Sequence, residues 1–122
     1  MNNIKLEYQD YFDENKNKSL EFSSDLIKEP YNLKSLMALK VDGKSMQPVI
    51  NDKALVVADL SQKELLNASI YLVYKDNRMW IKKYDLENET FVSINKDFAH
   101  LVYDLKDVHL VAKVLLTFTT FA

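Results

Sequence analysis

Apolar and polar residues alternate along much of this chain, and the alternation predicts short β-strands rather than helices. A period of two residues is typical of a strand with one buried face, and a short continuous apolar run is typical of a strand buried on both faces. The predicted strands are residues 4–12, 36–41, 54–58, 70–74, 79–84, 91–94 and 108–121. Strands this short, with turns about every ten residues, predict a mostly β fold.

Asparagine and aspartate have to form most of the turns, because Gly43 is the chain's one glycine. These two residue types tolerate positive φ angles better than other residues with a side chain. Asp76 and Asn77 stand at the centre of residues 75–78, which predicts a tight hairpin between two of the strands. Residues 13–18 are polar and are predicted to form a loop.

Two short helical segments are also predicted. Residues 23–27 begin with two serines, which favour the first position of a helix, and this helix should end before Pro30. Residues 62–66 are predicted to form one helical turn.

The composition is that of a globular protein, with 48% hydrophobic and 28% charged residues among 122. This length predicts one domain, residues 1–122, in which residues 1–32 form a less certain lead-in. No apolar run approaches the roughly 20 residues of a membrane span, and residues 1–5 lack an apolar signal region. Cysteine is absent, which excludes disulfides and thiolate sites. We therefore expect a cytoplasmic protein without a membrane contact.

The charge balance argues against DNA binding by this segment. The net charge is −2, the pI is about 5.7, and Arg78 is the one arginine. A DNA-binding domain usually has a basic patch and a high pI. If the protein binds DNA, another segment should do so.

The segment most suggestive of chemistry is residues 41–48, where a strand leads through Gly43 to Ser45 and then to a turn closed by proline. Because glycine is so scarce here, Gly43 is expected to mark a backbone position that other residues do not tolerate. Such a turn can expose the Ser45 hydroxyl and leave nearby amides free to bind an oxyanion. The alternative, purely structural interpretation is that Ser45 hydrogen-bonds a neighbouring backbone amide in its own turn.

A serine hydroxyl needs a base to become a nucleophile. The two histidines, His100 and His109, lie in no recognisable catalytic or metal-binding pattern and are interpreted as ordinary residues. A lysine can serve if it is neutral. Its pKa must then fall by about three units from about 10.4, which requires burial among apolar groups.

Strand alternation suggests which lysines could be buried in this way. Trp80, Lys82 and Tyr84 share one face of the predicted strand at 79–84, so two aromatic residues flank Lys82. Lys83 shares the other face with Met79 and Ile81, and alternation alone does not choose between the two lysines. The ordinary interpretation of either is an exposed lysine on a strand.

Residues 41–48 resemble the V-x-G-x-S-M-x-P motif of the LexA, UmuD and phage-repressor family of Ser–Lys peptidases. Residues 81–83 resemble the family's segment in which the first lysine is catalytic, and the separation of Ser45 and Lys82 is similar to the family's. The resemblance implies that Ser45 is the nucleophile and Lys82 the general base. It also implies that Gly43 shapes the turn and that the region of Ser45 and Met46 supplies the oxyanion-hole amides.

The resemblance covers roughly residues 33–118, including a Ser, Asn and aromatic pattern at 93–98 and a closing strand at 108–114. It implies the fold of a LexA-like C-terminal domain, in which small twisted sheets form a β-clip or partly open barrel. The chain departs from the family at Lys44, where an acidic residue is usual, and at residues 52–54, where an Asp-Gly-Asp turn is common. Both changes add positive charge, which could help to keep Lys82 neutral.

The larger departure concerns the substrate. Family members cut themselves at an Ala-Gly or Cys-Gly bond upstream of the serine, but residues 1–42 contain no glycine and Ala38 is their one alanine. The family's N-terminal helix-turn-helix is not among these residues either. We therefore expect the regulatory domain of a LexA-like or phage-type repressor that carries a Ser–Lys peptidase site. The alternatives are a non-catalytic dimerisation module with a relic dyad and a UmuD-like polymerase accessory protein.

The resemblance also implies partners. The family dimerises through this domain, and the apolar tail Val111, Leu115, Leu116, Phe118 and Phe121 could supply a core strand, a dimer contact or both. DNA contact would come through a helix-turn-helix domain outside these residues. A recombinase filament formed in the DNA-damage (SOS) response could act as the trigger. No cofactor and no metal are expected.

Overall fold

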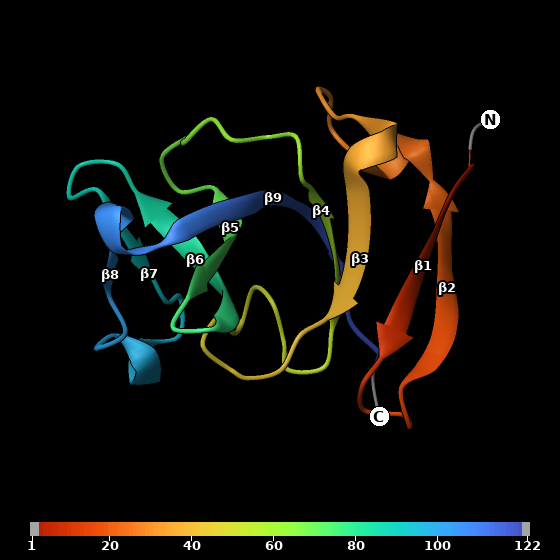
Figure 1. Ribbon diagram of the computed structural model, residues 1–122, viewed down its shortest axis with the longest axis horizontal. Helices are drawn as coiled ribbons and strands as arrows, with labels where there is room; N and C mark the ends of the chain where they lie inside the picture. Colours follow the sequence, from red (N-terminus) through yellow and green to blue (C-terminus); the bar gives the residue numbers. More distant parts are fainter. Residues whose placement is uncertain (1–2, 121–122) are drawn as a thin grey trace.

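The computed structural model describes residues 3–120, and strands account for most of its regular structure (Figure 1). This confirms the prediction of a mostly β fold. The strands are β1 (Asn3–Asp10), β2 (Lys16–Ser23), β3 (Leu36–Lys40), β4 (Leu55–Asp59), β5 (Ile70–Lys75), β6 (Arg78–Asp85), β7 (Thr90–Val92), β8 (Tyr103–Asp104) and β9 (His109–Phe118). Single turns of 3₁₀ helix are η1 (Ser24–Leu26), η2 (Leu33–Ser35), η3 (Lys96–Phe98) and η4 (Leu105–Asp107).

Seven of the strands form one antiparallel sheet in the order β3-β4-β9-β5-β6-β7-β8. The long last strand, β9, lies inside the sheet because it pairs with β4 on one side and β5 on the other. Both pairings contain a register shift, so β9 bends as it crosses the molecule (Figure 1). The sheet does not close into a barrel, because its edge strands β3 and β8 are not paired with each other.

The hairpin of β1 and β2 forms a second, two-stranded sheet. It packs on the large sheet through Ile4 and Phe22, which contact Val57 in one apolar cluster, and the ring of Phe22 lies 5.8 Å from that of Phe118. The polar loop predicted over residues 13–18 is wrong in its second half, because β2 already begins at Lys16. The first residues of β2 are polar and exposed, so no alternation of apolar and polar residues is visible there in the sequence.

The hairpin of β5 and β6 carries the predicted tight turn. Lys75 pairs with Arg78, and the two residues between them, Asp76 and Asn77, have φ angles of 54° and 64°. Positive φ at both central positions is the backbone of a two-residue turn whose twist matches that of the strands. The hairpin prediction is confirmed, and it places residues 79–84 on a strand with the expected alternation.

The two predicted helical segments have opposite outcomes. The Ser23 side chain accepts a hydrogen bond from Asp25 N–H and caps η1, as predicted. The turn predicted at residues 62–66 is wrong, since this segment is irregular. The buried hydroxyl of Tyr71 holds it instead, by accepting from Leu66 N–H at 2.8 Å and donating to Glu64 O at 2.7 Å.

A buried carboxylate joins the segments at the end of β4. Asp59 is fully buried and accepts hydrogen bonds from Asn32 N–H, from Ser61 N–H and hydroxyl, and from the Gln62 side chain. Burial alone would raise the pKa of Asp59, but these donors outweigh it and hold the pKa below its ordinary value. The charged form is therefore the one that the fold stabilises.

We predict that Asp59→Ala lowers the free energy of unfolding by about 3 kcal/mol, because the substitution leaves several buried donors without an acceptor. Denaturant unfolding at neutral pH measures the loss, and Asp25→Ala, an exposed carboxylate in η1, is the matched control. Because the pKa of Asp59 is lowered, its contribution is present near neutral pH and is lost as pH falls through the carboxyl range. Equal stability of the two variants would contradict this role.

Candidate active site

Ser45 lies in a loop between β3 and β4 that is closed at its base by two backbone hydrogen bonds. Val41 N–H donates to Ala54 O at 2.8 Å, and Lys53 N–H donates to Val41 O at 2.8 Å. Inside the loop, Met46 and Ile50 are buried in the same apolar cluster as Val41. The side chain of Met46 therefore anchors the loop to the core, while the half-buried Ser45 beside it stays accessible.

Gly43 occupies the backbone position that its scarcity led us to expect. Its φ angle is +119°, a conformation that residues with a Cβ rarely adopt. Its N–H donates to the Asp52 carboxylate at 2.8 Å, so it ties the two sides of the loop together. The Gly43 N–H is thus already hydrogen-bonded within the loop. The positive φ angle at Gly43 determines the path of the backbone leading to Ser45.

Lys82 reaches Ser45 from β6, although 37 residues separate them in the chain. Its side chain is fully buried, and its Nζ lies 2.8 Å from Ser45 Oγ and 3.1 Å from Ser93 Oγ. Lys83, which alternation left as the other candidate, is only half-buried on the opposite face of the strand. The structure brings Ser45 and Lys82 together and leaves Lys83 apart.

Burial lowers the pKa of Lys82 from 10.5 to about 8. The surroundings are aromatic, as alternation suggested: Nζ lies 5.6 Å from the centre of the Trp80 ring, and Tyr84 is buried on the same face. Tyr71 faces Lys82 across the β5–β6 ladder. A buried amine with this pKa is partly neutral near pH 7, so it can accept a proton.

The lysines near the loop do not cause this shift. We expected that Lys44 and Lys53 could help to keep Lys82 neutral, but burial is the cause of its lowered pKa. Lys53 Nζ instead lies 3.7 Å from the Asp52 carboxylate, and Lys44 also lowers the pKa of Asp52 by its charge. Both lysines therefore act on Asp52, and burial alone lowers the pKa of Lys82.

The segment after β7 contacts both members of the pair. Ser93 Oγ accepts from Lys82, while Asn95 N–H donates to Ser45 O at 2.9 Å and the Asn95 side chain donates to Lys44 O at 2.9 Å. Sequence reasoning matched these two residues to a family pattern but assigned them no role. A serine and an asparagine two residues apart, on one side of an extended segment, were the available signal.

Two backbone amides next to the hydroxyl are free of protein partners. Among residues 3–120, neither Ser45 N–H nor Met46 N–H donates to a protein acceptor. Free amides beside a nucleophile can stabilise the negative oxygen that forms when a carbonyl is attacked. The loop and the end of the Lys82 side chain from β6 thus bring a hydroxyl, an amine and two backbone donors into one region.

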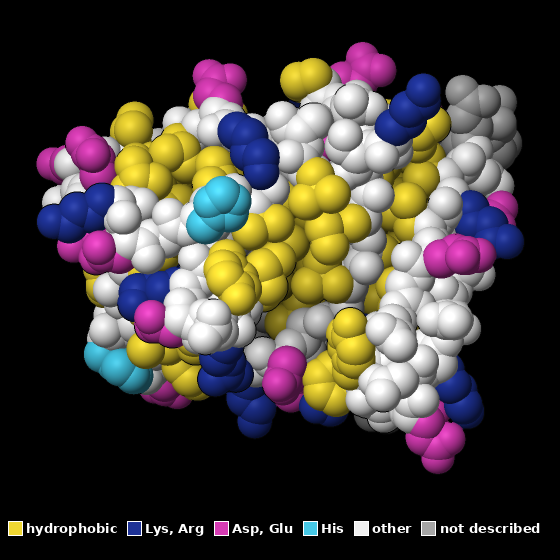
Figure 2. Space-filling model, viewed as in Figure 1, with side chains coloured by type: hydrophobic (Ala, Val, Ile, Leu, Met, Phe, Trp, Pro, Cys, Tyr) yellow, Lys and Arg dark blue, Asp and Glu magenta, His cyan; other side chains and the backbone are white. Residues whose placement is uncertain are grey.

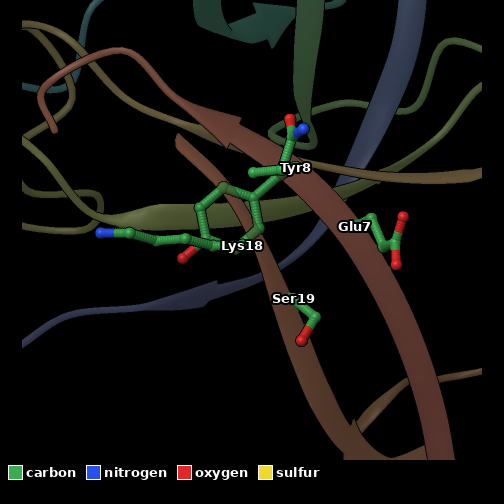
Figure 3. A pocket seen from close by; sticks show the side chains of 5 residues that line it. Glu7, Tyr8, Lys18 and Ser19 are labelled. Carbon is green, nitrogen blue, oxygen red and sulfur yellow. The ribbon is translucent and has the colours of Figure 1, made fainter. Parts of the chain in front are cut away.

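Other features of the described chain offer no comparable site. His100 and His109 are both exposed, and no group of three or more potential metal ligands occurs within residues 3–120. A shallow hollow lies on the β1–β2 hairpin, lined by Glu7, Tyr8, Asn17, Lys18 and Ser19. Figure 3 shows that Lys18 and Tyr8 lie together there, and Lys18 already pairs with Asp10 at 2.8 Å. This hollow contains neither Ser45 nor Lys82.

Two comparisons with known proteins bear on this site. The profile of the family described as Peptidase S24-like matches residues 1–115. A curated relative from Haemophilus influenzae (strain ATCC 51907 / DSM 11121 / KW20 / Rd), named "Uncharacterized HTH-type transcriptional regulator", is 33% identical over 81 residues. That alignment covers 57% of this chain and 34% of the relative, so the chain spans about a third of the relative's length.

The buried lysine should cost stability at neutral pH. Its pKa is about 8 in the folded chain and 10.5 ordinarily, so the unfolded chain binds the proton more tightly. The free energy of unfolding should therefore rise as pH increases from about 8 to 10.5. We predict that Lys82→Met stabilises the fold at pH 7 by up to about 3 kcal/mol.

Denaturant unfolding at pH 7 and at pH 10 measures this effect, with Lys83→Met as the matched control. The advantage of Lys82→Met over the natural chain should shrink at the higher pH, where Lys82 is already neutral. A difference that does not change with pH would show that Lys82 is not a desolvated amine.

Proposed function

The chain belongs to the Peptidase S24-like family, and we propose that it is the regulatory domain of a repressor-type transcriptional regulator with a Ser45–Lys82 peptidase site. The observation that carries the peptidase part is the 2.8 Å separation between Lys82 Nζ and Ser45 Oγ, with the lysine fully buried. The relative named as an HTH-type transcriptional regulator supports the regulatory part.

The proposed reaction begins with neutral Lys82. Ser45 Oγ attacks a peptide carbonyl carbon while its proton passes to Lys82 Nζ, and the amides of Ser45 and Met46 stabilise the oxyanion. The intermediate collapses when the amine leaves with the proton that Lys82 returns. Water then hydrolyses the acyl-enzyme by the same route, with Lys82 taking and returning a proton. The hydrogen bond between Nζ and Oγ provides the path for each transfer.

The substrate of this proposed site is a peptide bond outside residues 1–42. Residues 1–42 lack the Ala-Gly or Cys-Gly pair. We therefore propose cleavage of a bond elsewhere in a longer natural protein, triggered by a recombinase filament in the DNA-damage response. DNA contact would belong to a helix-turn-helix segment in that longer protein. The missing pair also favours a second candidate, a dimerisation module that retains an idle dyad.

A homodimer is the proposed assembly, and its proposed contact is the apolar surface around β9. This strand is half-buried along most of its length, including Val111, Leu115, Leu116 and Phe118, whereas Phe121 lies outside the described residues. Figure 2 shows hydrophobic side chains gathered at the centre of one face, over β9 and beside β3. Half-exposed apolar side chains along a strand favour pairing with a second copy.

Among residues 3–120, no helix is long and apolar enough to cross a membrane.

The peptidase proposal is tested by incubating the full-length natural protein above the pKa of Lys82, at pH about 9. Cleavage should rise with pH through about 8 and then level off, because neutral Lys82 is the reactive form. Ser45→Ala and Lys82→Ala should abolish cleavage, and Lys83→Ala, on the other face of β6, should not. Equal cleavage in all of these chains would refute the dyad, and no cleavage in the natural protein would favour the idle module.

For the dimer we predict that sedimentation equilibrium gives twice the chain mass for the natural protein. Val111→Asp should yield a folded monomer, because it introduces a charge into the proposed contact on β9. Leu86→Asp, at an exposed position in the turn after β6, should leave the dimer intact. Circular dichroism confirms that both variants are folded. A monomeric natural protein at concentrations well above the micromolar range would exclude this assembly.

A further inference from the structure

Three side-chain polar atoms, not two, meet at the buried end of Lys82. Nζ lies 2.8 Å from Ser45 Oγ and 3.1 Å from Ser93 Oγ. Ser93 belongs to neither the serine loop nor β6, since it follows β7. The family resemblance explains Ser45 and Lys82 but leaves the purpose of this second hydroxyl open.

The hydrogen-bonding capacity of a neutral amine indicates what Ser93 can do. Neutral Nζ has two N–H donors and a single lone pair, and only the lone pair can accept the Ser45 proton. A free amine rotates about the Cε–Nζ bond, so its lone pair would point toward Ser45 only part of the time. An acceptor that holds one N–H on the other side limits this rotation. Ser93 Oγ is such an acceptor.

The position of Ser93 is fixed independently of Lys82. Val92, its neighbour, pairs with Lys83 in the β6–β7 ladder. Asn95, two residues further on, donates from its backbone to Ser45 O and from its side chain to Lys44 O. The segment is therefore tied to the lysine strand at one end and to the serine loop at the other. Ser93 lies between these two attachments.

We propose that Ser93 is a positioning residue, which holds one N–H of neutral Lys82 so that the amine's lone pair faces the Ser45 hydroxyl. This inference rests on the proposed function, because it assigns Ser93 a part in the same proton transfer. Ser93 acts through Lys82 and does not itself attack the substrate.

A fluorophosphonate probe tests this geometry without knowledge of the natural substrate. In the labelling step Ser45 Oγ forms a bond to phosphorus, the phosphorus–fluorine bond breaks, fluoride leaves, and the hydroxyl proton goes to Lys82. Mass spectrometry of the whole chain follows the rate, and Ser45→Ala defines the background. The variants are Ser93→Ala, which removes the acceptor, and Ser93→Thr, which keeps a hydroxyl. Ser35→Ala is the matched control, a half-buried serine in η2.

Labelling of Ser93→Ala should be at least about tenfold slower, since the loss of one well-placed hydrogen bond costs that much. Ser93→Thr should restore most of the rate, and Ser35→Ala should label at the natural rate. The pKa of Lys82 is measured in the same proteins by NMR of ¹³C-labelled lysine. It should fall below the natural value of about 8 in Ser93→Ala, because the ammonium loses an acceptor. A slower reaction despite a more neutral amine identifies orientation, rather than basicity, as what was lost.

The proposal is overturned if Ser93→Ala labels at the natural rate, or if it leaves the pKa of Lys82 unchanged. Failure of the natural chain to label at Ser45 would count against the proposed peptidase function itself. The pKa comparison would then decide alone whether Ser93 holds the Lys82 amine, with an unchanged value overturning the contact.

Discussion

The burial of one lysine amine is the constraint on which the rest of the site depends. Lys82 lies on an inner strand of the large sheet and is fully buried, with its Nζ 5.6 Å from the centre of the Trp80 ring and with Tyr71 paired opposite it. A charged ammonium is poorly solvated in such a place, so the fold favours the neutral amine and lowers the pKa of Lys82 to about 8. In place of water, the amine is hydrogen-bonded to the hydroxyls of Ser45 and Ser93.

The architecture delivers these groups from three separate segments. The β5–β6 hairpin carries the lysine, a loop anchored by the buried Met46 carries Ser45, and the segment after β7 joins the two through Ser93 and Asn95. Backbone hydrogen bonds and the buried Met46 side chain attach the two non-strand segments to the sheet, so the sheet fixes the geometry of the site. The same arrangement explains why the site should cost stability. An apolar side chain at position 82 would fill the same space in the core without the free-energy cost of burying an amine.

The sequence predicted the strands and the dyad better than it predicted the connections. Alternation placed Lys82 between two aromatic residues, but it could not separate Lys82 from Lys83, because both faces of that strand carry apolar neighbours. Only the resemblance chose, and burial in the sheet agrees with that choice. The start of β2 was missed because its first residues are polar. The irregular conformation of residues 62–66 was missed because it depends on hydrogen bonds with the Tyr71 hydroxyl. The contact of Ser93 with Lys82 depends on long-range packing, which local pattern does not encode.

The most direct test of the account is an NMR titration of Lys82 in the natural chain with ¹³C-labelled lysine, assigned by the signal that disappears in Lys82→Met. The account predicts a pKa of about 8 for this one lysine. It also predicts that the titrating signal moves when Ser45 is replaced by alanine, since the two side chains are hydrogen-bonded. A pKa near the ordinary 10.5, unaffected by Ser45→Ala, would contradict it, because Lys82 would then be a solvated cation and not a base beside a serine.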